Sequence, residues 1–107
     1  MKMVNFTKLI THIKNYDSGR ELLIKKSRDV LKLSKQIIYA VHRDEITEAA
    51  KLITQIEKEK TTLDKISKHS AKMSCEGSYK VAIQEYVEAI LYFNFLKKSF
   101  ILINSLS

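Results

Sequence analysis

The chain has 107 residues, of which 45% are hydrophobic and 29% are charged, and 19 Lys and Arg against 12 Asp and Glu give a formal net charge of +7. This length and composition predict one small globular domain and exclude an intrinsically disordered chain. The positive charge favours a polyanionic partner, either nucleic acid or an anionic membrane surface.

Turn-forming residues are scarce, since the chain has no proline and only two glycines, Gly19 and Gly77. Folds built from strands need turn signals every 8–12 residues or so. We therefore predict an all-α protein, an antiparallel helical bundle of about four helices. No stretch approaches the ~20 apolar residues of a membrane helix, so we expect no membrane partner. The lone Cys75 excludes an internal disulfide and fits a reducing compartment, so we expect a cytoplasmic protein.

The first two predicted helices are amphipathic. A short one ends near Asn15, because apolar residues before it recur at helical spacing. The next is predicted from about Gly19 to His42, with Asp17 or Ser18 as its cap. Its apolar stripe, with two small serines, consists of Leu23, Ser27, Val30, Ser34, Ile37 and Val41.

A third helix is predicted from Asp44, as its capping residue, to about Ser70. Its apolar residues follow three- and four-residue steps typical of bundles, at Ile46, Ala49, Ile53, Ile56 and Leu63. Because the junction with the preceding helix is short, the two helices should be antiparallel neighbours.

A fourth helix is predicted from about Tyr79 to Lys98, after a connection over residues 73–78 that contains Gly77. This helix is apolar nearly all round, so it should be central in the bundle. An apolar tail follows over residues 99–107. We treat residues 1–107 as a single helical domain.

A basic stripe lies on the second helix, where steps of three and four residues place Lys25, Arg28, Lys32 and Lys35 on one face. Tyr39 and His42 continue the same line. A row of cations that ends in an aromatic ring suits single-stranded nucleic acid, whose phosphates meet the charges and whose bases stack. We predict that Lys25, Arg28, Lys32, Lys35, His42 and Arg43 contact nucleic acid. The alternative is a solvated face whose charges form intrahelical or interhelical ion pairs.

A pair of carboxylates, Glu85 and Glu88, lies three positions apart on the most apolar helix, with no Lys or Arg one turn away. Two close anions repel and resist ionisation, and a divalent cation relieves that repulsion. Magnesium and manganese prefer such oxygen ligands and can activate water for attack on a phosphodiester. The alternative is that both carboxylates have basic partners on other helices.

Two segments resemble the translin/Trax family. The first contains Arg20-Glu21-Leu22, Ser27-Arg28-Asp29, Ser34-Lys35 and His42-Arg43, and the second is the run from Gln84 to Ala89, which is closer to the Trax-type motif. The resemblance covers about residues 16–98. It implies part of a larger bundle of about seven helices that assembles into closed oligomers and binds single-stranded RNA and DNA. It also implies that Glu85 and Glu88 are the metal ligands and catalytic residues of a Mg²⁺- or Mn²⁺-dependent endoribonuclease.

One departure from the family concerns length, because family members are about twice as long and no Asp or Glu follows Glu88 here. We therefore expect only the N-terminal half of such a protein, with an exposed fourth helix and tail. Such a chain should form a homo-oligomer or pair with a translin-type partner chain. The alternatives to a nuclease are a catalytically inactive binding subunit and a helical protein-interaction module without a nucleic-acid role.

Overall fold

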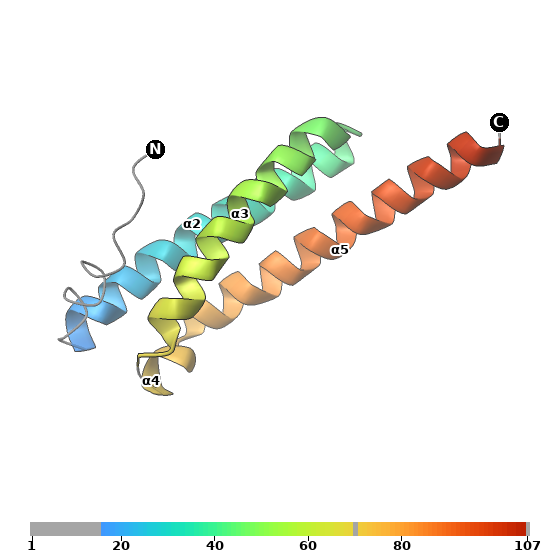
Figure 1. Cartoon of the computed structure of the whole chain (residues 1–107). Helices are drawn as coiled ribbons and strands as arrows, with labels where there is room; N and C mark the ends of the chain where they lie inside the picture. The colour runs from blue at the N-terminus through green and yellow to red at the C-terminus, as the bar shows by residue number, and fades with distance from the viewer. Residues whose placement is uncertain (1–15, 70, 107) are drawn as a thin grey trace.

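The computed structural model describes residues 16–69 and 71–106, which form four helices (Figure 1). These are α2 (Tyr16–His42), α3 (Ile46–Ser67), α4 (Ala71–Ser74) and α5 (Gly77–Leu106). This part of the chain contains no strand, which confirms the predicted all-α helical bundle. The short helix predicted before Asn15 falls outside the described residues.

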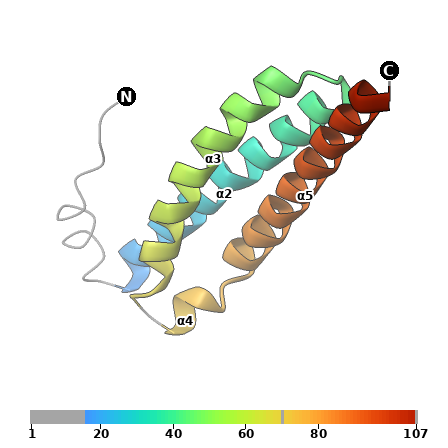
Figure 2. The same ribbon diagram turned by 45° about the vertical axis from the view of Figure 1, so that its right-hand side comes forward.

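Helix α2 lies between the other two long helices (Figure 2). The chain runs out along α2, returns along α3 and runs out again along α5, so α3 is antiparallel to α2, and α5 is parallel to it. Helix α2 packs against both neighbours, whereas α3 and α5 meet over a shorter stretch. The prediction that the most apolar helix would be central was therefore wrong. Within the described residues nothing covers the side of α5 that faces away from α2.

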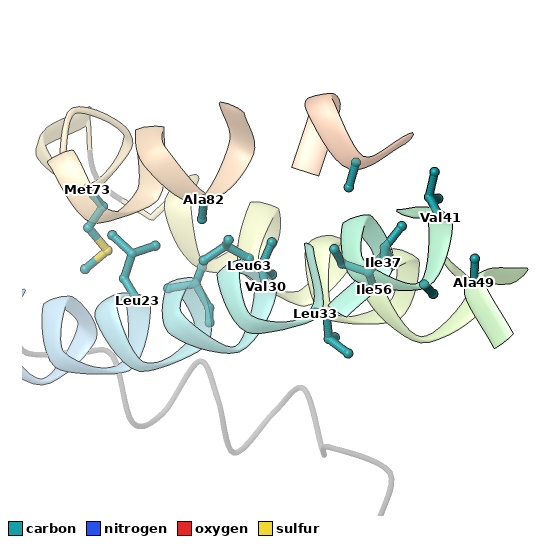
Figure 3. Packing of buried hydrophobic residues seen from close by; sticks show 13 residues of the cluster. Leu23, Val30, Leu33, Ile37, Val41, Ala49, Ile56, Leu63, Met73 and Ala82 are labelled. Carbon is teal, nitrogen blue, oxygen red and sulfur yellow. The ribbon is translucent and has the colours of Figure 1, made fainter. Parts of the chain in front are cut away.

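The core is built around the predicted stripe of α2, whose residues Leu23, Val30 and Ile37 are fully buried (Figure 3). Ile56 and Leu63 of α3 close the core from one side. Small buried residues lie on both α2 and α5. Because interiors are tightly packed, short side chains allow these two helices to approach each other closely. These buried small residues are Ser27 and Ser34 of α2 and Ala82 and Ala89 of α5.

The connection between α2 and α3 is a tight turn at Asp44, whose φ of 57° is left-handed. The Glu45 amide donates to the Ala40 carbonyl at 2.9 Å and the Asp44 amide to the Val41 carbonyl at 3.0 Å. These two bonds define a Schellman turn, a helix ending that usually has glycine at the left-handed position. Asp44 therefore closes α2, and the prediction that it caps α3 was wrong. Glu45 is the residue that precedes α3, and its side chain makes no capping bond.

The other predicted boundaries shift as well. Helix α2 begins at Tyr16, so Asp17 and Ser18 lie within its first turn, and α3 ends at Ser67. The predicted connection over residues 73–78 contains part of α4, where Met73 is buried against the core. Helix α5 begins at Gly77 and continues to Leu106, so the apolar tail is helical. None of the described helices is both long and apolar enough to span a membrane.

Candidate nucleic-acid interface

The four residues of the basic stripe, Lys25, Arg28, Lys32 and Lys35, are all exposed on α2. They lie on the side of the helix opposite the buried residues Leu23 and Val30, because the helical repeat places these two sets about half a turn apart. From Lys25 to Lys35 the stripe extends for about 15 Å at 1.5 Å per residue. The rigid core beneath α2 therefore holds these four cations in one row.

The charges of the basic stripe have no carboxylate partner within the described residues. The ion pairs of α2 involve other residues, since Lys26 lies 3.6 Å from Glu59 and Arg20 lies 2.5 Å from Glu76. Asp29 is half-buried beside Lys32, and both line the same hollow against α3, but the two side chains form no ion pair. The alternative prediction, a face neutralised by ion pairs, is not what the described residues show.

Tyr39 extends the stripe with an aromatic ring that is 60% exposed. The ring borders a hollow of about 330 Å³ between α2 and α3, whose other lining residues are Gln36, Arg43, Glu48 and Leu52. An exposed ring beside polar groups provides a surface on which a nucleic-acid base can stack. The hollow leaves room for that base next to the row of cations.

The two remaining predicted contact residues, His42 and Arg43, have partners of their own. The Arg43 guanidinium donates to the Glu45 carboxylate at 2.8 Å, which offsets part of its charge. The His42 ring lies 5.7 Å from the Tyr92 ring of α5. Both residues are exposed at the end of the stripe. They stay predicted contacts, but they are less free than the four residues of the basic stripe.

The predicted carboxylate pair lies on α5, where Glu85 is half-buried and Glu88 is exposed. A hydrogen bond with Glu85, the Glu85 charge and a small loss of solvent together raise the pKa of Glu88 above its ordinary value. Neither glutamate has a basic partner within the described residues. The pair lies at the surface of α5, and its role as a metal site stays a prediction.

A metal site at this pair would need further ligands. No group of three or more His, Cys, Asp or Glu side chains that could hold a metal exists among residues 16–69 and 71–106. Two carboxylates have the right chemistry for Mg²⁺ or Mn²⁺, which accept oxygen ligands. The described residues do not complete a catalytic centre, so no catalytic step follows from them.

The sequence analysis missed a set of polar contacts between α3 and α5. The Tyr79 hydroxyl donates to Asp64 at 3.0 Å, and the Tyr86 hydroxyl donates to Glu57. Lys60 donates to Asp64 at 2.7 Å and lies over the Tyr86 ring, 5.2 Å from its centroid. Burial and the bond to Glu57 raise the pKa of Tyr86 to about 12. The sequence does contain one signal for these contacts, because Lys60 occupies a position between Ile56 and Leu63 where the periodicity of α3 would place an apolar residue.

Fold and surface together describe a small all-α bundle protein with a row of exposed cations on its central helix. The sequence profile of the Translin family matches residues 18–105, and the chain belongs to this family. The match includes most of the segment after Lys98. Searches among curated proteins and among solved structures each found no match. Family membership indicates nucleic-acid binding in general and a capacity to oligomerise.

Proposed function

We propose that this protein binds single-stranded RNA or DNA through the basic stripe of α2, with Tyr39 as the stacking residue. The observation that carries the proposal is the row of exposed cations, Lys25, Arg28, Lys32 and Lys35, which have no carboxylate partner within the described residues. Such cations replace condensed counterions on a phosphate backbone, and their release drives binding. Membership of the Translin family supports the same conclusion.

Single strands fit this surface better than duplexes. Only three arginines occur in the chain, and arginine is the commonest reader of guanine edges in the major groove. A solvent-facing aromatic ring, in contrast, contacts unpaired bases of any sequence. The proposed binding is therefore sequence-tolerant and dominated by phosphates.

We further infer a Trax-type branch of the family, supported by the run from Gln84 to Ala89. In that branch Glu85 and Glu88 would hold Mg²⁺ or Mn²⁺. Because the described residues supply only these two carboxylates, RNA cleavage by this chain alone is not part of the proposed function. Binding without cleavage is the activity we expect.

The proposal is tested by measuring the binding of a fluorescent single-stranded RNA by polarisation. One variant changes the basic stripe to glutamine: Lys25→Gln, Arg28→Gln, Lys32→Gln and Lys35→Gln. A matched control changes four exposed lysines elsewhere: Lys51→Gln, Lys58→Gln, Lys68→Gln and Lys80→Gln. Both variants lose the same charge, so only the position of that charge differs.

We expect the stripe variant to bind at least tenfold more weakly than the control. Each lost phosphate contact should reduce the slope of log K against log salt by about 0.7. Equal losses of RNA affinity in both variants would show that binding depends on the overall positive charge and not on the basic stripe. No binding by the unmodified protein at low salt would favour a protein-interaction module. RNA cleavage in Mn²⁺ that Glu85→Ala/Glu88→Ala abolishes would instead establish a metal nuclease.

A further inference from the structure

The outward side of α5 carries apolar residues that no described element covers. Leu91 is 63% exposed, Phe95 71% and Leu102 60%. They lie opposite Ala82 and Ala89, which are buried against the rest of the bundle. Among the residues whose side chains the structure describes, Leu96 is the last of α5 that packs against the core, and the helix continues beyond it to Leu106 (Figure 1). Monomeric proteins rarely expose a continuous apolar surface of this kind.

The outer stripe of α5, as we name it, follows alternating steps of four and three residues. It consists of Gln84, Glu88, Leu91, Phe95, Lys98 and Leu102, which are all exposed. This spacing keeps a residue facing a partner helix on every turn, as in helix pairs that pack side by side. The stripe therefore has the pattern of a helix–helix contact, and the chain supplies no described helix to fill it.

The four central residues of the outer stripe, from Glu88 to Lys98, are complementary to their own reverse order, whereas the outermost pair sets Gln84 against Leu102. Leu91 and Phe95 are equally distant from Phe93, and so are Glu88 and Lys98 on either side of them. If two copies of α5 pack antiparallel about that midpoint, Leu91 of each copy meets Phe95 of the other. Glu88 of each copy then meets Lys98 of the other at both ends of the apolar centre.

We propose that the outer stripe of α5 is a two-fold contact between two copies of this chain, packed antiparallel about Phe93. A twofold contact presents the same surface patch on both subunits, and this patch is complementary to itself. The proposed contact does not include the basic stripe of α2. The proposal therefore concerns a second surface, separate from the one proposed to bind nucleic acid.

The charges support this occupant over an unrelated partner. Neither Glu88 nor Lys98 has an oppositely charged partner within residues 16–69 and 71–106. An ammonium group from the second copy relieves the repulsion between Glu85 and Glu88 that a metal ion would otherwise relieve. Opposite charges at symmetric positions also fix the register of the two helices, since a shifted pairing places Lys98 against apolar residues.

The contact extends over about 27 Å of helix from Gln84 to Leu102. One helix pair buries less surface than a standard stable interface, so we expect a dimer that dissociates at roughly micromolar concentration. Sedimentation velocity of the full chain, without nucleic acid and over a range of concentrations, measures this equilibrium directly.

The deciding variants reverse the two charges. Glu88→Lys and Lys98→Glu each place like charges opposite one another twice per dimer, so each should raise the dissociation constant roughly tenfold. The double variant Glu88→Lys/Lys98→Glu restores the opposite pairs and should recover the original constant. Lys97→Glu is the matched control, because Lys97 lies off the outer stripe, and it should leave the dimer intact.

Two further outcomes would overturn the proposal. A monomer at every concentration would show that the outer stripe does not bind a second copy. Association that continues into larger species and ignores both single charge reversals would show unspecific apolar aggregation. Phe95→Asp provides an independent check, since a carboxylate in the apolar centre should abolish the dimer while circular dichroism shows an unchanged helix content. Retained RNA binding by the monomeric variant Phe95→Asp, which changes no residue of the proposed binding or metal sites, separates this result from a failure of the proposed function.

Discussion

Helices α2 and α5 are both long and nearly parallel, yet their outer faces have opposite chemistry. Helix α2 is apolar toward the core and basic toward solvent, with Lys25 and Lys32 exposed. Helix α5 carries apolar residues on both faces, with Ala89 buried and Leu91 exposed. A helix whose outer face is charged needs no further cover, whereas an apolar outer face indicates a partner. The two faces therefore point to two different kinds of partner.

The largest expected effect is a difference in stability between a substitution in the buried face of α2 and one in the exposed face of α5. Ile37→Ala removes a fully buried side chain of α2 and leaves a cavity, so the free energy of unfolding should fall by about 2–5 kcal/mol. Leu91→Ala, on the outer face of α5, should change it by less than about 0.5 kcal/mol in dilute protein. Urea denaturation followed by circular dichroism measures both. Similar losses for the two variants would mean that α5 is covered in the monomer.

The next prediction compares the two outer faces as binding surfaces. Tyr39→Ala should weaken RNA binding by about 1–3 kcal/mol, because a base loses its stacking partner. Phe95→Ala is the control, since it removes an aromatic ring from α5 that is even more exposed, at 71% against 60% for Tyr39. Polarisation assays below the concentration at which dimers form should show no loss for Phe95→Ala. A larger loss of RNA affinity for Phe95→Ala than for Tyr39→Ala would show that RNA binds to α5 and not to the basic stripe of α2.

A smaller effect is expected at the end of α2, where Asp44 is left-handed. A side chain in this conformation costs roughly 1–2 kcal/mol relative to glycine, and aspartate lowers that cost only in part. Asp44→Gly should therefore raise the free energy of unfolding by about 1 kcal/mol, even though glycine makes the unfolded chain more flexible. Thermal unfolding compares it with Asp44→Ala, which should give no gain. Equal stabilisation by both would point to the lost charge instead.

The last prediction is a pH dependence at the inner face of α5, which appears only above pH 10. The pKa of Tyr86 is about 12 in the folded chain against an ordinary value of 10.0. Above pH 10 the unfolded chain loses this proton more readily than the folded chain, so stability falls as the pH rises toward 12. Tyr86→Phe should lose less stability than the unmodified protein over this range. Identical pH profiles would show that other groups cause the decline.

The sequence predicted the elements better than their boundaries. The buried stripe of α2 follows from its periodicity, since Leu23, Val30 and Ile37 are the residues that pack in the core. The role of Asp44 was predicted wrongly: it ends α2 and does not cap α3. Aspartate is favoured both as a helix cap and in left-handed turns, so its residue type alone does not distinguish the two roles. Only the backbone bonds of Glu45 and Asp44 to the end of α2 decide between these two roles.

The candidate site was predictable to the extent that it lies on a single helix. Spacing alone places the four residues of the basic stripe on one face. Contacts between helices were not predictable in this way, because spacing within one helix says nothing about its neighbours. The bond from Tyr79 to Asp64 and the contact of His42 with Tyr92 became visible only in the structure.

The short turn between α2 and α3 has a consequence for the order in which the chain folds during synthesis. Helices close in sequence can pair before distant segments are available, because closing a short loop costs little entropy. As the N-terminal segment leaves the ribosome first, α2 and α3 can form a hairpin while α5 is still being translated. Helix α5, with its buried Ala82 and Ala89, is then the last long helix to pack against α2.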